Sequence, residues 1–329
     1  MGKYTCLLDI VTIAETLGAL FSMLTSGILL TLLCSSKHAR LGTYKYLMIS
    51  CCSIQMLYSI TSFSSHMRAH STSISYVLFR KYKGPHRDLA PFLLLQFCWM
   101  YITNIVILCI QFLYRYIYLW KDSKTHWFEK SKLFLWISFA VLFGFTIIIL
   151  KYMYLGENHY LKKHLNDEFE QFYGLSMDEI IYNGPVYYKD EKKPIEVWLT
   201  IGILTVGMSL CYISMMIFGF MSYLKLRDHK SILSEKTRDL QKQLLIALVI
   251  QATIPSLLIF IPYEILFISP IFGIGLGPYA NIPMVFLTIY PPLDQIGVIY
   301  IIKDFRTALK TFIKKSLSGS ISSSWSSFL

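Results

Sequence analysis

The chain alternates long apolar stretches with shorter polar segments. Seven apolar stretches are long enough to cross a bilayer, which takes about 20 helical residues, and they lie at residues 10–33, 44–64, 89–120, 133–153, 197–224, 240–268 and 280–302. Backbone groups in lipid must form their hydrogen bonds within the spanning segment, and the alternating strands of a membrane barrel are not seen in this sequence. The pattern predicts an all-α membrane protein, a seven-transmembrane helix bundle within residues 1–302.

Three polar segments have patterns of their own. Residues 303–315 place apolar side chains on one helix face and basic ones largely elsewhere, which predicts a short amphipathic helix on the inner leaflet, with a frayed basic tail as the alternative. Residues 316–329 are rich in serine and are expected to be disordered. The acidic segment 154–196 predicts either a structured extracellular lid or a flexible loop, and Ser176 with Glu179 fits a capping box that would begin a short helix.

Composition and charge favour a membrane protein and give its orientation. Hydrophobic residues make up 54% of the 329 residues and charged ones 16%, whereas a soluble domain has about 25% charged residues, so a soluble or disordered chain is excluded. The net charge of +11 alone is compatible with nucleic acid or with a membrane. However, 18 Lys and Arg lie in or beside the loops at 34–43, 121–132 and 225–239 and the C-terminal tail, against 12 at the other loops. The positive-inside rule therefore predicts an extracellular N-terminus and a cytoplasmic C-terminus, and no nucleic acid is expected as a partner.

The sequence lacks the motifs expected of an enzyme or of a metal site. G-x-S-x-G, P-loop and H-E-x-x-H sequences do not occur in it, so we expect no enzyme activity and no cofactor. His66 and His70 have the spacing of metal ligands on a helix, but a third ligand is not close in the sequence. A solvated loop is the expectation for both histidines.

Polar side chains within the predicted spans are candidates for a ligand pocket, because such groups are costly in lipid. The third span contains four of them, Gln96, Trp99, Thr103 and Asn104. Gln96 and Thr103 fall on one helical stripe with Tyr114, and the outer half of this stripe is expected to face the bundle interior; hydrogen bonding between helices is the alternative. Glu264, near the outer end of the sixth span, is a further candidate, although both it and Glu15 of the first span could instead extend to the membrane interface.

Several stretches are similar to one known family. They are LGTYKYLMIS at 41–50, FLYRYIYLW at 112–120, FEKSKLFLW at 128–136, LQKQLLIALVIQATIP at 240–255 and IYPPLDQIGVIYIIKDFR at 289–306. In this order they resemble the cytoplasmic half of the Str class of nematode seven-transmembrane chemoreceptors, which belongs with the Srj and Srd classes to the serpentine receptor superfamily. The resemblance implies a G-protein-coupled olfactory receptor, located in the plasma membrane of sensory cilia.

The implied partners are a small volatile or water-soluble odorant, a heterotrimeric G protein and membrane lipids. A ligand-gated chemosensory channel or a transporter is the alternative function. We find no internal repeat, and seven spans do not divide into two equal halves, as transporters usually do. Insect chemosensory channels have seven helices but an intracellular N-terminus, so the orientation of the chain distinguishes them from a receptor.

The predicted residues for G-protein coupling and switching are Arg115, Tyr114, Tyr116, Asp294 and Tyr300. Arg115 lies near the inner end of the third span and is expected to contact the sixth helix or the G protein, with simple extension to the interface as the alternative. Two features depart from familiar receptors. Tyr114-Arg115-Tyr116 replaces the Asp-Arg-Tyr of rhodopsin-like receptors, and Gln295 follows Asp294 where the Str family commonly has proline.

The sixth span contains Gln251, Pro255 and Pro262. Proline removes a backbone donor and kinks a helix, so this span is predicted to contain a hinge; a static kink is the alternative. The disulfide that joins the third helix to the following extracellular loop in rhodopsin-like receptors cannot form here, because residues 154–196 contain no cysteine.

Overall fold

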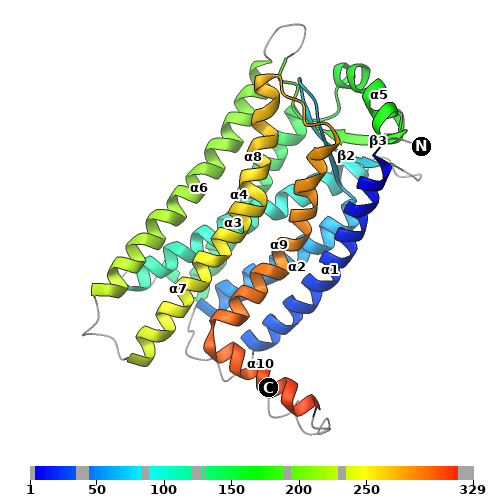
Figure 1. Cartoon of the computed structure of the whole chain (residues 1–329). Coiled ribbons are helices and arrows are strands. Elements are labelled where there is room, and N and C mark those ends of the chain that lie inside the picture. The colour runs from blue at the N-terminus through cyan, green and yellow to red at the C-terminus, as the bar shows by residue number, and fades with distance from the viewer. Residues whose placement is uncertain are drawn as a thin grey trace.

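A bundle of long helices makes up most of the computed structural model, which describes residues 4–34, 44–82, 89–119, 127–128, 130–188, 194–228 and 235–317. Seven helical spans in these ranges are long and apolar enough to cross a membrane. They are α1 (Thr5–Cys34), α2 (Tyr44–Ser65), α3 (Leu89–Leu119), α4 (Lys130–Tyr154), α6 (Ile195–Asp228), the interrupted span Glu235–Phe272, and α9 (Ile282–Ile301). Figure 1 shows them side by side, and the predicted seven-helix bundle is confirmed.

The outside of the bundle is apolar, as a membrane-spanning surface must be. Leu20 on α1, Phe134 on α4 and Met216 on α6 are among many large apolar side chains that are exposed. Soluble proteins rarely expose contiguous apolar patches larger than a few hundred Å². Lipid is therefore the solvent that suits this surface.

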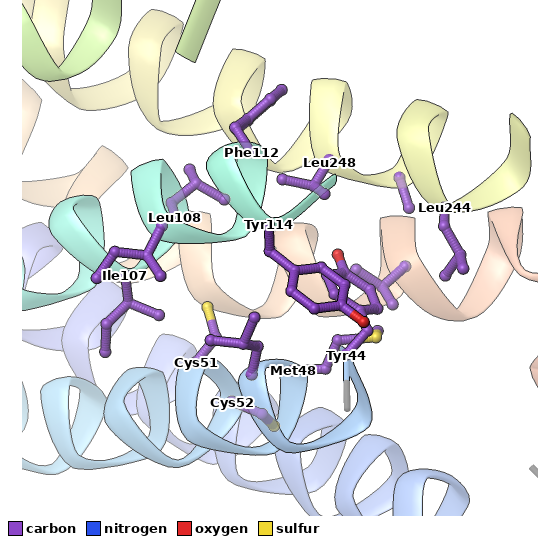
Figure 2. Close-up of a cluster of buried hydrophobic side chains, with 14 of the residues drawn as sticks. Tyr44, Met48, Cys51, Cys52, Ile107, Leu108, Phe112, Tyr114, Leu244 and Leu248 are labelled. Carbon is purple, nitrogen blue, oxygen red and sulfur yellow. The ribbon is translucent and has the colours of Figure 1, made fainter. Parts of the chain in front are cut away.

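The central helix of the bundle is α3, which packs against α2, α4, α6 and α7. A cluster of buried side chains fills the end of the bundle farthest from the N-terminus. Figure 2 shows Met48 and Cys51 of α2 and Ile107 and Phe112 of α3 in this cluster, with Leu248 on the neighbouring α7. Because helices surround α3 on most sides, it has no single inward face.

The sixth span is divided by a change of helix type. It begins as α7 (Glu235–Pro255), continues through one π-helical turn, η4 (Ser256–Phe260), and resumes as α8 (Ile261–Ile268) and the 3-10 turn η5 (Ser269–Phe272). Pro255 ends α7, and Pro262 lies in the first turn of α8, where its missing N–H does least harm. The two prolines thus flank a π turn, a feature that is frequent at functional sites. The hinge itself stays a prediction.

A small sheet and a helix cover the end of the bundle at which the chain begins. The strands β1 (Arg68–Ser71), β2 (Tyr76–Lys81) and β3 (Ile180–Asn183) form an antiparallel sheet in the order β1-β2-β3. The helix α5 (His159–Tyr173) packs its apolar face on this sheet. We call β1, β2, β3 and α5 together the cap, and Figure 1 places it beside the N-terminus.

The cap departs from the predicted all-α fold. The described part of residues 154–196 contains α5 and β3. Where the capping box predicted the start of a short helix, the structure has only the 3-10 turn η3 (Met177–Glu179), in which Ser176 Oγ accepts from Asp178 N at 3.3 Å. The sequence does not predict these strands, because their pairing joins segments that are far apart in the chain. Leu78 of β2 pairs with Asn183 of β3, and the pattern of either segment alone does not indicate this partner.

At the opposite end of the bundle, the chain turns after α9 into α10 (Lys303–Leu317). Ile302 has an extended backbone between the two helices. Phe305 on α10 is fully buried against the cluster of Figure 2, while Lys303 and Lys310 are exposed, which is the arrangement of an amphipathic helix. The last residues of the predicted disordered tail, 318–329, lie outside the described residues.

Candidate functional site

A cavity lies between α3, α6 and the η4–α8 segment, on the cap side of the bundle. Its volume is about 110 Å³, and Leu78 of β2 forms part of its wall. The polar lining residues are Cys98, Tyr101, Lys151, Thr205, Tyr263 and Glu264; the others are apolar or aromatic. Such a space, apolar with a few polar groups, is typical of a site for a small organic molecule.

Two charged side chains give this cavity its polar character. Lys151, at the end of α4, donates a hydrogen bond from Nζ to Cys98 Sγ at 3.1 Å. Glu264, in the first turn of α8, is partly buried and contributes a carboxylate. The cavity therefore offers the amino group of Lys151 and the carboxyl group of Glu264 in a wall that is otherwise made of apolar, aromatic and uncharged polar side chains.

Two of the predicted pocket residues face α4 instead of the cavity. Trp99 Nε1 donates to the carbonyl oxygen of Val141 at 3.0 Å. A Cβ atom added to Gly144 would lie 2.7 Å from Thr103 Oγ1, so this glycine lets α3 and α4 approach closely. Trp99 thus forms a hydrogen bond between helices, the alternative that the sequence left open, whereas Thr103 only packs against α4, and its Oγ1 has no hydrogen-bond partner among the described residues.

The other predicted pocket residues divide between the core and the cavity. Asn104 is buried and donates from Nδ2 to Tyr290 Oη at 3.1 Å, which joins α3 to α9. Gln96 is partly buried and does not line the cavity, whereas Glu264 does. The sequence missed Cys98 and Tyr101 because helical periodicity identifies a stripe, but not which neighbour it faces in a helix that is surrounded.

A buried polar network connects the middle of the bundle. Asp294 Oδ2 accepts from Gln55 Nε2 at 2.5 Å and from Gln251 Nε2 at 3.1 Å, so one carboxylate holds α9, α2 and α7 together. Gln295 donates from Nε2 to Ser26 Oγ of α1 at 2.7 Å. Gln295 thus contacts a fourth helix. Gln251 forms a contact between helices and also lies one turn before the π turn.

Arg115 is buried at the end of the bundle opposite the cap. Its Nη1 donates to Gln241 Oε1 of α7 at 2.6 Å, and its guanidinium lies 3.6 Å from the ring centroid of Tyr44. Tyr44 in turn donates to Gln111 and stacks against Tyr114, as Figure 2 shows for the two tyrosines. Arg115 Nε and Nη2 have no hydrogen-bond partner within the described ranges. The predicted contact with the sixth span is therefore present, and two donors of a buried cation are left for a partner.

Tyr116 and Tyr300 lie apart from Arg115. Tyr116 stacks against Phe218 of α6 with the ring centroids 5.7 Å apart. Tyr300 is 68% exposed, and the guanidinium of Arg306 lies 5.6 Å from its ring centroid. The structure therefore does not bring the five predicted switch residues into one site: Tyr114 belongs with Arg115, and Asp294 belongs to the buried network.

A buried ion pair attaches the cap to the bundle. Arg68 of β1 donates from Nη1 to Glu15 Oε1 and from Nη2 to Thr12 Oγ1, both at 2.7 Å. Glu15 and Arg68 are 4% and 7% exposed. Glu15 thus does not extend to the membrane interface as the sequence had left open, because a cation from a distant strand reaches it.

Only one of the two histidines departs from the expected solvated loop, because His70 lies in β1 whereas His66 lies in an exposed turn. His70 is fully buried, with Tyr173 Oη 3.0 Å from Nδ1 and a carboxylate oxygen of Glu168 3.1 Å from Nε2. Burial raises the pKa of the Tyr173 phenol, so Tyr173 stays protonated and can donate to the imidazole. His66 remains half-exposed. No group of three His, Cys, Asp or Glu that could hold a metal ion lies within the ranges described.

Comparison with known proteins relates the chain to one group. The profile of the family described as serpentine type 7TM GPCR chemoreceptor Str matches residues 11–310. Serpentine receptor class r-10 of Caenorhabditis elegans is 27% identical over 313 residues, covering 93% of this chain and 91% of that protein. G-protein coupled receptor str-33 of the same organism is 24% identical over 318 residues, with 94% and 92% covered. Serpentine receptor class J-38 is 24% identical over 292 residues, with 86% and 87% covered.

Proposed function

Because the chain belongs to the Str family of serpentine seven-transmembrane chemoreceptors, we propose that it binds a small odorant in the cavity between α3, α6 and α8 and activates a heterotrimeric G protein. The family is one of receptors, not of enzymes, and the chain is a multi-pass membrane protein. In this proposal the cap is extracellular, α10 lies on the inner leaflet, and the receptor works in the plasma membrane of sensory cilia. The observation that supports it best is the cavity, because it touches the π turn of the sixth span.

The dimensions and lining of the cavity favour a small, mostly apolar ligand. One water needs about 10–15 Å³ of such space, so about 110 Å³ suits a molecule of roughly ten non-hydrogen atoms. Apolar contacts would provide most of the affinity, and Lys151 or Glu264 would orient one polar group of the ligand. Odorants combine these two properties.

A physical path leads from this cavity to Arg115. Ile259 and Phe260 of the π turn line the cavity, so a ligand there contacts the segment that directly follows Pro255. A shift of the π turn would move α7, on which Gln241 accepts the hydrogen bond from Arg115. A ligand that binds the shifted state more tightly would thereby free Arg115 for a partner at the cytoplasmic end.

Nucleotide exchange tests this proposal. The purified receptor in lipid nanodiscs is combined with a set of Gα proteins and a panel of small odorants, and agonists are expected to accelerate exchange. Gln241→Leu removes the acceptor and is expected to raise exchange without ligand, while Arg115→Ala abolishes the ligand response. If no odorant accelerates exchange on any Gα, or if Arg115→Ala leaves the response intact, the proposed coupling is wrong.

The orientation distinguishes the receptor from the ligand-gated channel. An epitope tag at Met1 is expected to be stained on intact cells. Staining only after permeabilisation would place the N-terminus inside, which favours the channel.

A further inference from the structure

The carboxyl group of Asp294 lies in the middle of the bundle without a cation beside it. Asp294 is 1% exposed, and none of the ion pairs formed among the described residues includes it. An ionised carboxylate far from water is costly unless a cation lies near it. We propose that Asp294 binds a proton and, as a carboxylic acid, donates a hydrogen bond from Oδ1 to Gln251 Oε1. The proposal goes beyond the proposed function, because this proton-binding site lies outside the ligand cavity.

Two acceptors without a donor point to this proton. Gln251 Nε2 donates to Asp294 Oδ2 at 3.1 Å, so the two side chains are already in contact. Their second oxygens, Asp294 Oδ1 and Gln251 Oε1, are both buried and have no hydrogen-bond partner in the described part of the chain. Both are acceptors while the carboxyl group is ionised, whereas a protonated carboxyl group has one O–H donor. A single proton therefore satisfies both oxygens.

The geometry of the two groups assigns the proton to one oxygen. A carboxyl group and a primary amide are both planar, so one hydrogen bond between them allows the remaining pair of atoms to meet and close a ring of two hydrogen bonds. Gln55 Nε2 also donates to Asp294 Oδ2, at 2.5 Å. Because Oδ2 accepts from two amides, it keeps the role of the carbonyl oxygen, and Oδ1 is left to carry the proton.

The surroundings of Asp294 favour a proton over a metal ion. The titratable groups that face it are the thiols of Cys51 and Cys52 on α2 and the phenol of Tyr290 on α9, none of which is a cation. From α1 and α7 the network receives hydroxyl groups and the amide of Gln251. Hard metal cations take about six or more oxygen ligands, whereas the contact offers two open oxygens within the described ranges.

The bound proton would strengthen the contact between α7 and α9. With it, Asp294 and Gln251 share two hydrogen bonds; without it, they share one and leave two buried oxygens unpaired. Gln241, which accepts the hydrogen bond from Arg115, lies on the same helix α7. The proton therefore favours the state in which α7 holds Arg115, and its release would favour separation of α7 from α9.

Infrared difference spectroscopy tests the proposal on the full chain at neutral pH. The receptor is placed in nanodiscs of an ether-linked phosphatidylcholine, because ester carbonyls of ordinary lipids would overlap the carboxylic-acid band. The spectrum of Asp294→Asn is subtracted from that of the wild type. We expect the difference to contain the C=O band of a carboxylic acid. Asp178→Asn is the matched control: this carboxylate is exposed and paired with Lys162, so its difference spectrum should contain carboxylate bands only.

Two further variants test the contact with Gln251. Gln251→Met removes one hydrogen bond to the C=O oxygen and should move the band to higher wavenumber. Asp294→Asn should have a Tm close to that of the wild type, since its Nδ2 can donate to Gln251 Oε1 while its oxygen accepts from Gln55. Asp294→Leu should have a lower Tm, because both amides lose their acceptor.

The opposite results overturn the proposal. Asp294 is ionised if the wild type minus Asp294→Asn difference contains carboxylate bands alone. A band that Gln251→Met does not move shows that the acid is not joined to Gln251, and an Asp294→Asn variant as unstable as Asp294→Leu contradicts the exchange of O–H for N–H. These measurements need neither odorant nor G protein, so their failure is distinct from a failure of the proposed function.

Discussion

Replacing Arg68 with methionine should destabilise the cap strongly, because it leaves the buried carboxylate of Glu15 without its main partner. The two side chains are hydrogen-bonded at 2.7 Å and nearly inaccessible to water. Removing one member of a buried ion pair costs about 3–5 kcal/mol. His66, 3.4 Å from the other carboxylate oxygen and 46% exposed, provides little compensation.

The exposed ion pair of the cap supplies a matched control. Lys162 and Asp178 also form an ion pair, but their side chains are 41% and 71% exposed. Exposed pairs contribute about 0–1 kcal/mol. Asp178→Asn should therefore leave stability nearly unchanged, although it breaks an ion pair in the same part of the molecule.

Thermal unfolding in nanodiscs and hydrogen exchange of the β1 and β2 amides measure the effect. For a chain of 329 residues, a loss of about 3–5 kcal/mol corresponds to a decrease in Tm of about 4–7 °C, together with faster exchange in both strands. The double variant Glu15→Gln/Arg68→Met should recover much of the loss, since no charge remains buried. The reasoning is refuted if Arg68→Met costs no more than Asp178→Asn, or if the double variant is less stable than Arg68→Met alone.

Further predictions concern three other positions. Gln241→Glu should form an ion pair with the buried Arg115 and thereby lower ligand-stimulated nucleotide exchange. Nucleotide-exchange assays would measure this loss, and ligand-binding assays should show an unchanged affinity for the ligand. Gly18→Ala should lower the free energy of unfolding by about 1–3 kcal/mol, and with it the Tm, because a Cβ atom would lie 2.6 Å from the carbonyl oxygen of Thr288. An unchanged Tm would contradict this prediction. Asn281→Leu removes the acceptor for the backbone N–H of Ala69 and the donor to its carbonyl oxygen, and it should accelerate hydrogen exchange in β1 at least tenfold, with β3 less affected.

The sequence was sufficient to predict the seven spans, because crossing lipid imposes length and apolarity on each segment separately. It also indicated the contact of Arg115 with the sixth span, since a cation within a span needs a partner. The cap could not be predicted in this way. The pairing of Leu78 with Asn183 and the bond between Arg68 and Glu15 depend on segments that are far apart in the chain. The burial of His70 could not be predicted either, because its spacing from His66 indicates only a possible pair of metal ligands.

The ligand cavity shows a different limit of sequence reasoning. Helical periodicity grouped Gln96 and Thr103 on one stripe of the third span, but Thr103 faces α4. The cavity is lined by Cys98 and Tyr101, which lie at other angles around the same helix. The direction of a stripe is set by which helices surround it, and that is a property of the packed bundle.

All seven cysteines of the chain are free, so the cap is joined to the bundle without a covalent cross-link. Its attachments to the rest of the chain include the Arg68 ion pair, the hydrogen bonds between Asn281 and the backbone of Ala69, and the backbone hydrogen bonds between Ser71 and Gly277. Since no disulfide contributes to these attachments, the cap can assemble in a reducing medium as readily as in an oxidising one, and its stability depends on noncovalent contacts alone.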